Sequence, residues 1–170
     1  RFNTMYGVEF FPEPQNFSLS EKAVKIPGLD GSGKMGKSEG NCIYLLDEEK
    51  VLRKKVMRAV TDEGPKAPNS PMSEPIKNLF TLLELVSTPD KVQFFTDAYN
   101  DCSIRYGDLK KEIAQDILNI TTPIRERIID IQNDEEYLSK VVRMGAEKAR
   151  ERASKTLEEV RQIMGIKRFY

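Results

Sequence analysis

Histidine is absent from this 170-residue sequence, and only two cysteines are present, Cys42 and Cys102. Without an imidazole, no site in the chain uses histidine as a general base or as a metal ligand. The two cysteines stand far apart and form no CxxC pair, so the sequence predicts neither a zinc site nor a disulfide framework. We expect both to be buried free thiols in a reducing compartment.

Long apolar runs and an excess of charge of one sign are also missing. No stretch approaches the roughly 18 apolar residues that span a bilayer, and no secretory leader opens the chain. Lysine and arginine balance aspartate and glutamate at 27 each, so net charge argues neither for nor against a polyanionic partner. We expect a soluble, cytoplasmic protein, and the start at Arg1 suggests a truncated or processed product of a longer one.

Charge is nevertheless segregated along the C-terminal half. Residues 108–136 hold eight acidic and four basic side chains, whereas residues 143–170 hold eight basic and four acidic ones. One interpretation is a solvated helix surface rich in Glu and Arg neighbours. The other is a basic strip that binds nucleic-acid phosphates. Charge alone does not choose between them.

The first third of the chain differs from the rest in its apolar pattern. Residues 1–46 indicate the end of an α/β unit, with one short buried strand over 23–29 before a glycine-rich loop. From Asp47 the apolar period is helical, and Asp47 is expected to N-cap a helix that stops near residues 61–62. The residues expected on its inner face are Val51, Leu52, Val56, Ala59 and Val60.

After a loop over 63–71, every segment has a helical pattern. Pro123 either starts a new helix or kinks an existing one, because proline lacks the amide that a continuous helix uses. Expected helix starts are Ser73 with Pro75, Thr88 with Pro89, Asp108, and Glu135, the last helix running to about Met164 with an apolar stripe. The expected inward residues are Ile76, Leu79, Phe80, Leu83, Val86, Val92, Phe95, Tyr99, Leu109, Ile113, Ile117 and Leu118.

Four aromatic residues invite a second interpretation as platforms on which nucleic-acid bases stack. Their helical spacing favours an ordinary core instead. These residues are Phe94, Phe95, Tyr99 and Tyr106.

The stretch "GSGKMGKSEGN", residues 31–41, contains two different phosphate-binding patterns. Residues 31–38 satisfy the Walker A spacing GxxxxGK(S/T). Residues 34–38 read KMGKS, one letter from KMSKS, the mobile lysine loop of class I aminoacyl-tRNA synthetases. A plain solvent-exposed turn is the third interpretation.

The residues after the loop argue against Walker chemistry. A P-loop runs directly into a helix whose amides face the phosphate, but here Gly40 and Asn41 interrupt the chain first. No later strand ending in aspartate is available to hold magnesium, since the rest of the chain is helical. Crowded glycines around Lys34 and Lys37 instead suit a flexible loop that lays two ammonium groups over one polyphosphate.

Beyond the loop, several segments resemble the bacterial-type tryptophanyl-tRNA synthetases in order and spacing. They are "FNTMYGVEFFPEP", "KIPGLDGSGKMGKSEGN", "VMRAVTDE", "RYGDLKKEIAQDIL", "TPIRERI" and "GAEKARERASKTLEEVRQIMG". The resemblance covers nearly the whole chain. It implies a mainly α chain: the end of a Rossmann-like class I catalytic domain (1–46, loop 34–38), a connecting helix (47–62) and an all-helical bundle domain that faces tRNA (63–170).

The resemblance also implies an activity and a set of site residues. Such an enzyme activates tryptophan with ATP to tryptophanyl-adenylate and transfers it to tRNA(Trp). Mg²⁺ accompanies the ATP without protein ligands, and the full-length enzyme is a homodimer. The matching loop positions imply Lys34 and Lys37 as catalytic ammonium groups on the leaving pyrophosphate. The implied ATP-binding residues are Ile26, Lys34, Met35, Gly36, Lys37 and Ser38.

Two departures from the family pattern matter. Gly36 replaces the first serine of KMSKS and removes one hydroxyl contact. The chain also has no HIGH-type motif and no tryptophan pocket, so it resembles only a C-terminal portion of the enzyme. We expect the isolated chain to fold at least from Asp47 onward but to be inactive. Two alternatives stay open: a noncatalytic helical RNA-binding module, and a tyrosyl or other class I synthetase with the same loop.

Overall fold

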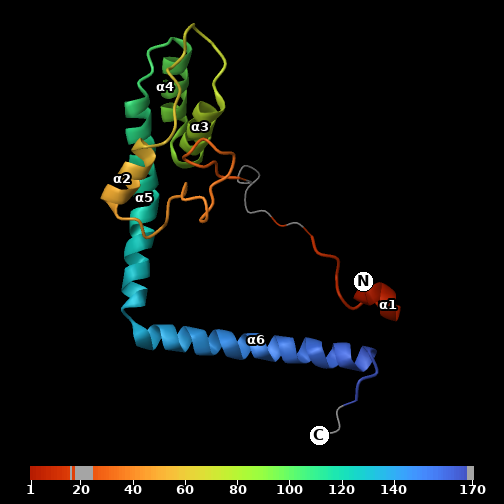
Figure 1. Cartoon of the computed structure of the whole chain (residues 1–170). Helices are drawn as coiled ribbons and strands as arrows, with labels where there is room; N and C mark the ends of the chain where they lie inside the picture. The colour runs from red at the N-terminus through yellow and green to blue at the C-terminus, as the bar shows by residue number, and fades with distance from the viewer. Residues whose placement is uncertain (16, 18–24, 168–170) are drawn as a thin grey trace. The chain divides into compact units, whose positions relative to one another are not determined.

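The structure is a computed structural model that describes residues 1–15, 17 and 25–167. Within these ranges it forms helices and no strand, which confirms the mainly α class. The helices are α1 (Phe2–Tyr6), α2 (Glu49–Met57), α3 (Glu74–Val86), α4 (Pro89–Asn100), α5 (Tyr106–Gln132) and α6 (Glu135–Ile163) (Figure 1). None of these described helices is long and apolar enough to cross a membrane.

The chain divides into two compact units. One comprises Arg1–Leu19 with Asp130–Tyr170, and the other comprises Ser20–Ile129, called the helical unit below. In the helical unit, α3 and α4 run beside the first half of α5, and α2 lies across it (Figure 1). Each of these helices turns an apolar stripe toward one shared core.

The core of the helical unit matches the predicted inward faces closely. Val86, Val92 and Tyr106 are partly buried against this core. The predicted residues that are buried are Leu52, Val56, Ala59, Ile76, Leu79, Phe80, Leu83, Phe95, Tyr99, Leu109, Ile113, Ile117 and Leu118. Apolar periodicity was sufficient here because one contiguous stripe on each helix meets the others.

Helix starts follow the sequence signals in three cases. Ser73 and Thr88 are the N-cap residues of α3 and α4, and each is followed by proline in the first turn. Asp134 caps α6, where its carboxylate accepts a hydrogen bond from the Tyr137 amide at 2.8 Å. The start predicted at Asp108 is two residues late, since α5 already begins at Tyr106 and runs through Pro123 as one helix.

The predicted start of α2 is wrong by one residue. Glu48, not Asp47, is the N-cap residue. The Asp47 carboxylate instead accepts a hydrogen bond from the Tyr44 amide at 2.9 Å and pairs with Lys55. The Asp47 carboxylate, which was expected to cap α2, is therefore occupied by Tyr44 and Lys55 instead.

The end of α2 also comes earlier than predicted, at Met57. The ammonium group of Lys110 on α5 donates to the Ala59 carbonyl at 2.7 Å, and the Val60 amide donates to the Leu29 carbonyl at 3.0 Å. Backbone groups that would continue the helix are therefore bonded to residues distant in the sequence.

The strand predicted over 23–29 is not formed over residues 25–29, the part of this range that the structure describes. Residues 23 and 24 lie outside the described part, and residues 25–29 are irregular. Their backbone groups bond within the following loop: the Ile26 carbonyl accepts from the Met35 amide at 2.7 Å. A strand requires a paired neighbour, and none of the described segments supplies one.

Four side chains predicted to be buried are exposed. Val51 on α2 is 42% exposed, and Val60, which lies beyond the end of α2, is 45% exposed. Phe94 precedes the buried Phe95 on α4 and is 66% exposed. Adjacent helical positions point about 100° apart, so Phe95 and Tyr99 share the inner face while Phe94 does not. Cys42 is buried as predicted, but Cys102 is exposed, at a turn residue with a positive φ of 63°.

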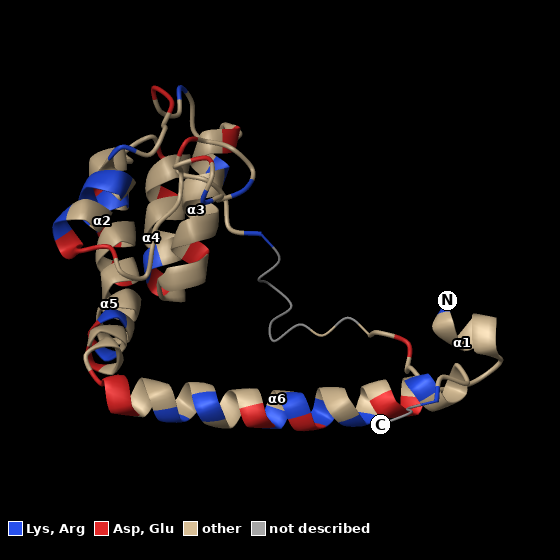
Figure 2. Ribbon diagram, turned by 60° about the horizontal axis from the view of Figure 1, so that its bottom comes forward, with Lys and Arg blue, Asp and Glu red and all other residues tan. Residues whose placement is uncertain are grey.

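The apolar stripe of α6 is not buried. No residue of α6 in the described range is buried, and Val142 is 68% exposed. Basic and acidic residues are interspersed along this helix (Figure 2).

Candidate functional site

The lysine loop, residues 26–41, is closed at its base by backbone hydrogen bonds. The Met35 amide donates to the Ile26 carbonyl at 2.7 Å, and the Leu29 amide donates to the Asn41 carbonyl at 3.1 Å. Leu29 is buried in the core of the helical unit, and Met35 packs partly against it. The base of the loop is therefore anchored, although its tip is exposed.

Inside the loop, the side chain of Asn41 makes hydrogen bonds at four points. Its oxygen accepts from the Gly36 amide at 2.9 Å. Its amide nitrogen lies 3.0 Å from an oxygen of Asp30, 2.9 Å from the Ser32 hydroxyl and 3.2 Å from the Lys34 carbonyl. Asn41 is only 6% exposed, so its side chain is shielded from water, whereas Asp30, Ser32 and Lys34 lie at the exposed side of the network.

Asp30 is the charged member of the network. Hydrogen bonding to the side chain and then the amide of Ser32, and next to Asn41, lowers the pKa of the Asp30 carboxyl. The hydrogen-bond network around Asn41, called the frame of the lysine loop below, therefore includes an ionised carboxylate at neutral pH.

Two glycines have separate structural requirements in this frame. A Cβ at Gly28 would overlap the polar atoms of Asp30, Ser32 and Asn41. Gly31 has a positive φ of 85°, which favours glycine.

A helix of the bundle holds the loop from outside. Asn78 on α3 donates from its side-chain nitrogen to the Gly31 and Ser32 carbonyls, both at 3.1 Å. Asn78 and Asn41 were both missed in the sequence, where Asn41 was interpreted only as a helix breaker. In the sequence, each asparagine is only a polar residue beside apolar ones. That pattern does not reveal that Asn78 binds Gly31, 47 positions away.

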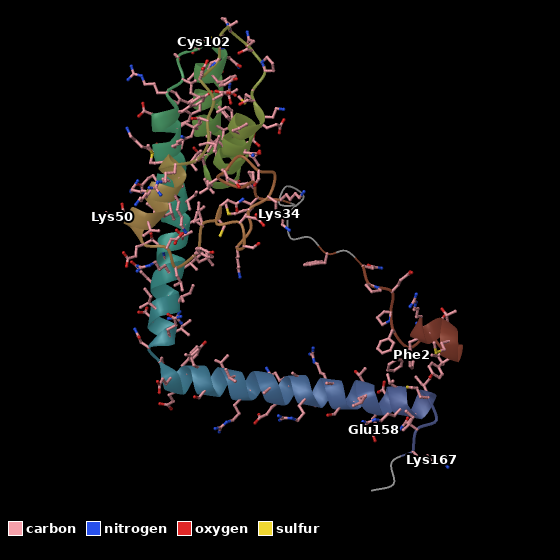
Figure 3. The ribbon with its side chains drawn as sticks, in the orientation of Figure 1. Phe2, Lys34, Lys50, Cys102, Glu158 and Lys167 are labelled. Carbon is pink, nitrogen blue, oxygen red and sulfur yellow. The ribbon has the colours of Figure 1, made fainter. Side chains whose placement is uncertain are left out.

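The six residues predicted to form the site all lie in this one loop. Lys34 (Figure 3) and Lys37 are both exposed. Neither forms an ion pair with any described residue. Ser38 is exposed, and its hydroxyl donates to Glu39 at 3.2 Å. A shallow hollow beside Lys34 is lined by basic, acidic and hydroxyl side chains, among them Lys25, Asp30, Lys34, Ser38 and Glu39. Two exposed ammonium groups three positions apart suit a phosphate-bearing ligand.

The remaining three predicted residues are held by the frame. Ile26 is 51% exposed, and its carbonyl is used by Met35. The Gly36 amide is already donated to Asn41, as the Met35 amide is to Ile26. The amides of Met35 and Gly36 are therefore already used within the loop, which leaves the side chains of Ile26 and Met35 for a ligand.

Walker geometry is absent from the loop. Residues 37–40 form a turn, and the next helix begins only at Glu49. No helix N-terminus follows Ser38, so no row of helical amides faces the lysines. Across the described ranges, no three acidic or cysteine side chains stand together as metal ligands.

Comparisons with known proteins find one family that matches more than half of the chain. Residues 1–122 match the family described as "tRNA synthetases class I (W and Y)". A tryptophan–tRNA ligase from Porphyromonas gingivalis is 62% identical over 167 residues, which are 98% of this chain and 51% of that protein. One from Clostridium longisporum is 35% identical over 99% of this chain and 50% of its own length. The chain thus spans about half the length of these relatives.

Solved structures share the fold. A tryptophanyl-tRNA synthetase from Mycoplasma pneumoniae superposes with a TM-score of 0.69 at 22% identity, covering 98% of this chain and 50% of that one. One from Campylobacter jejuni, complexed with ADP and tryptophan, gives 0.68 at 23% identity over 86% of this chain and 45% of that one.

Proposed function

The chain belongs to the class I tRNA synthetases (W and Y), and from this premise we propose that it is the C-terminal part of a tryptophan–tRNA ligase. The full-length enzyme would activate tryptophan with ATP and transfer it to tRNA(Trp). The 62% identity to the Porphyromonas relative, over 98% of this chain, supports tryptophan over tyrosine as the amino acid.

The exposed pair Lys34 and Lys37 carries the proposal. In adenylate formation the tryptophan carboxylate attacks the α-phosphorus of ATP, the bond to the bridging oxygen breaks, and pyrophosphate leaves with the electron pair. Ammonium groups that reach this leaving group best in the transition state lower the barrier. The step needs no proton transfer, so the lack of histidine is no obstacle.

The other loop residues have supporting roles in the proposal. Ile26 borders the adenine side of ATP, Ser38 offers its hydroxyl to the phosphates, and Met35 and Gly36 shape the backbone between the lysines. Mg²⁺ enters with ATP as part of the substrate. Residues 1–46 then belong to the catalytic domain, 47–62 to a connection, and 63–170 to a helical domain that faces tRNA, in a cytoplasmic, homodimeric enzyme.

Alanine substitution of either lysine tests the proposal in a full-length enzyme that carries this chain. Lys34→Ala and Lys37→Ala are each expected to slow tryptophan-dependent exchange of pyrophosphate into ATP by about 10²-fold, as for loss of a preorganised donor. The KM for tryptophan should change little. Lys66→Ala is the matched control, because Lys66 is an exposed lysine outside the lysine loop.

Two outcomes would contradict the proposal. One is a lysine variant that mainly weakens tryptophan binding, and the other is exchange that depends on tyrosine. The 170-residue chain alone should give no exchange, since it spans about half the length of its relatives.

The exposed, charged surface of α6 supports a second candidate, a noncatalytic RNA-binding module. Such a module would bind tRNA with a steep salt dependence and would have no catalytic parent polypeptide. A parent protein that catalyses the exchange reaction excludes it.

A further inference from the structure

The carboxamide of Asn41 has a definite orientation in the lysine loop. The Gly36 amide can only donate, so it faces the Asn41 oxygen, at 2.9 Å. The Lys34 carbonyl and the Asp30 carboxylate can only accept, so they face the Asn41 nitrogen, at 3.2 and 3.0 Å. Both ends of this side chain are therefore matched to their partners.

The two backbone contacts of Asn41 lie on either side of one residue. The Lys34 carbonyl precedes Met35, and the Gly36 amide follows it. The carboxamide thus fixes the backbone turn between Lys34 and Lys37. That turn determines how far apart the two ammonium groups start and in which directions they leave the chain.

We propose that Asn41 is a positioning residue that holds Lys34 and Lys37 as a pair toward one polyphosphate. This inference rests on the proposed function and extends it to a buried residue whose side-chain contacts all lie within the loop. Gly28 supports it independently, because a Cβ there would displace the Asn41 nitrogen from its partners. The lack of a side chain at Gly28 thus leaves room for the Asn41 carboxamide.

An isosteric substitution tests this role in the full-length enzyme. Asn41→Asp keeps the acceptor for the Gly36 amide but turns a second oxygen toward the Asp30 carboxylate and the Lys34 carbonyl, where it repels both. We expect kcat of tryptophan-dependent pyrophosphate exchange to fall by about 10- to 100-fold, because small misplacements of catalytic groups have effects of this size. The KM for tryptophan should stay unchanged.

The matched control is Asn119→Asp on α5. Asn119 is exposed and uses its oxygen as the acceptor for Gln115 at 2.9 Å, which an aspartate retains. It adds the same charge without touching the lysine loop and should leave kcat unchanged.

Coupling to the lysine separates positioning from a general structural role. If Asn41 acts through both lysines, Asn41→Asp should slow exchange by a smaller factor in the Lys34→Ala enzyme than in the parent enzyme, because only Lys37 remains to be misplaced. Fully multiplicative losses would overturn the inference. Thermal unfolding shows whether Asn41→Asp folds, and if it does not, Asn41→Ser removes the carboxamide without adding charge and carries the same expectation.

The two proposals fail in different ways. Normal kcat in Asn41→Asp, together with slow Lys34→Ala and Lys37→Ala variants, overturns the positioning role and leaves the synthetase proposal standing. Normal kcat in the lysine variants overturns both.

Discussion

Two glycines of the lysine loop differ in what they require from their position. Gly31 has a positive φ of 85°, and a Cβ there would also lie 3.4 Å from Pro75. Gly36 has no positive φ, and its closest neighbour would be the flexible side chain of Glu39 at 3.1 Å. The glycine that departs from the KMSKS pattern is therefore not the one that the backbone needs.

Gly31→Ala should lower the free energy of unfolding of this chain by about 1–2 kcal/mol, because an L-residue is strained in the left-handed region. Gly36→Ser should change it by less than about 0.5 kcal/mol, since only a surface side chain has to shift. Urea unfolding followed by circular dichroism measures both. An equal loss in the two variants would contradict this account of the loop.

At the scale of the elements, the end of α2 depends on α5. Lys110 is 8% exposed, and its ammonium group donates to the Ala59 carbonyl just beyond the helix. Burial lowers the pKa of the Lys110 ammonium group, which shows the cost of placing a cation there. The hydrogen bond compensates by satisfying a carbonyl that the early end of α2 leaves free.

Lys110→Met should destabilise the chain by about 1–3 kcal/mol, because the Ala59 carbonyl would stay buried without a donor. Lys111→Met is the control. Lys111 is exposed and, among the residues that the structure describes, pairs with Asp108 alone, at 3.0 Å, so its loss should cost less than about 0.5 kcal/mol. Comparable losses in the two variants, measured by urea unfolding, would show that Lys110 does not hold the end of α2.

At the scale of the whole molecule, one carboxylate ties three helices of the helical unit together. Asp116 on α5 is 6% exposed and accepts hydrogen bonds from Lys91 on α4, at 2.7 Å, and from Ser87 at the end of α3, at 2.6 Å. Desolvation raises the pKa of the Asp116 carboxyl, but the hydrogen bonds from Lys91 and Ser87 outweigh it, so the pKa is lowered below 3.8.

This shift predicts acid sensitivity of the helical unit. A lowered folded-state pKa means that the ionised carboxylate stabilises the fold above pH 3.8 and that this contribution is lost as the pH falls toward the folded-state pKa. Asp116→Asn should cost about 1–3 kcal/mol at neutral pH, and less in more acidic solution. Urea unfolding between neutral and acidic pH measures the difference. Asp108→Asn is the control, because it replaces an exposed carboxylate and should change the free energy of unfolding at neutral pH by less than about 0.5 kcal/mol.

The sequence by itself determined the features that depend on near neighbours. Ser73 and Thr88, each followed by proline, marked two helix starts, because capping involves only the first turn. Apolar spacing identified the core stripes of α2 to α5. The residues after Ser38 excluded a P-loop, since that geometry requires a helix directly after the loop.

Only the tertiary structure decided the features that depend on distant partners. Lys110 ends α2 from 51 positions away, and Asn78 holds the lysine loop from 47 positions away. Phe94 is exposed because the neighbouring elements meet the face of α4 that carries Phe95. Asn41 looked like a helix breaker in the sequence, and its hydrogen bonds became visible only once the loop had folded back around it. Periodicity specifies which face of an element is apolar, but contacts between elements decide what each polar side chain binds.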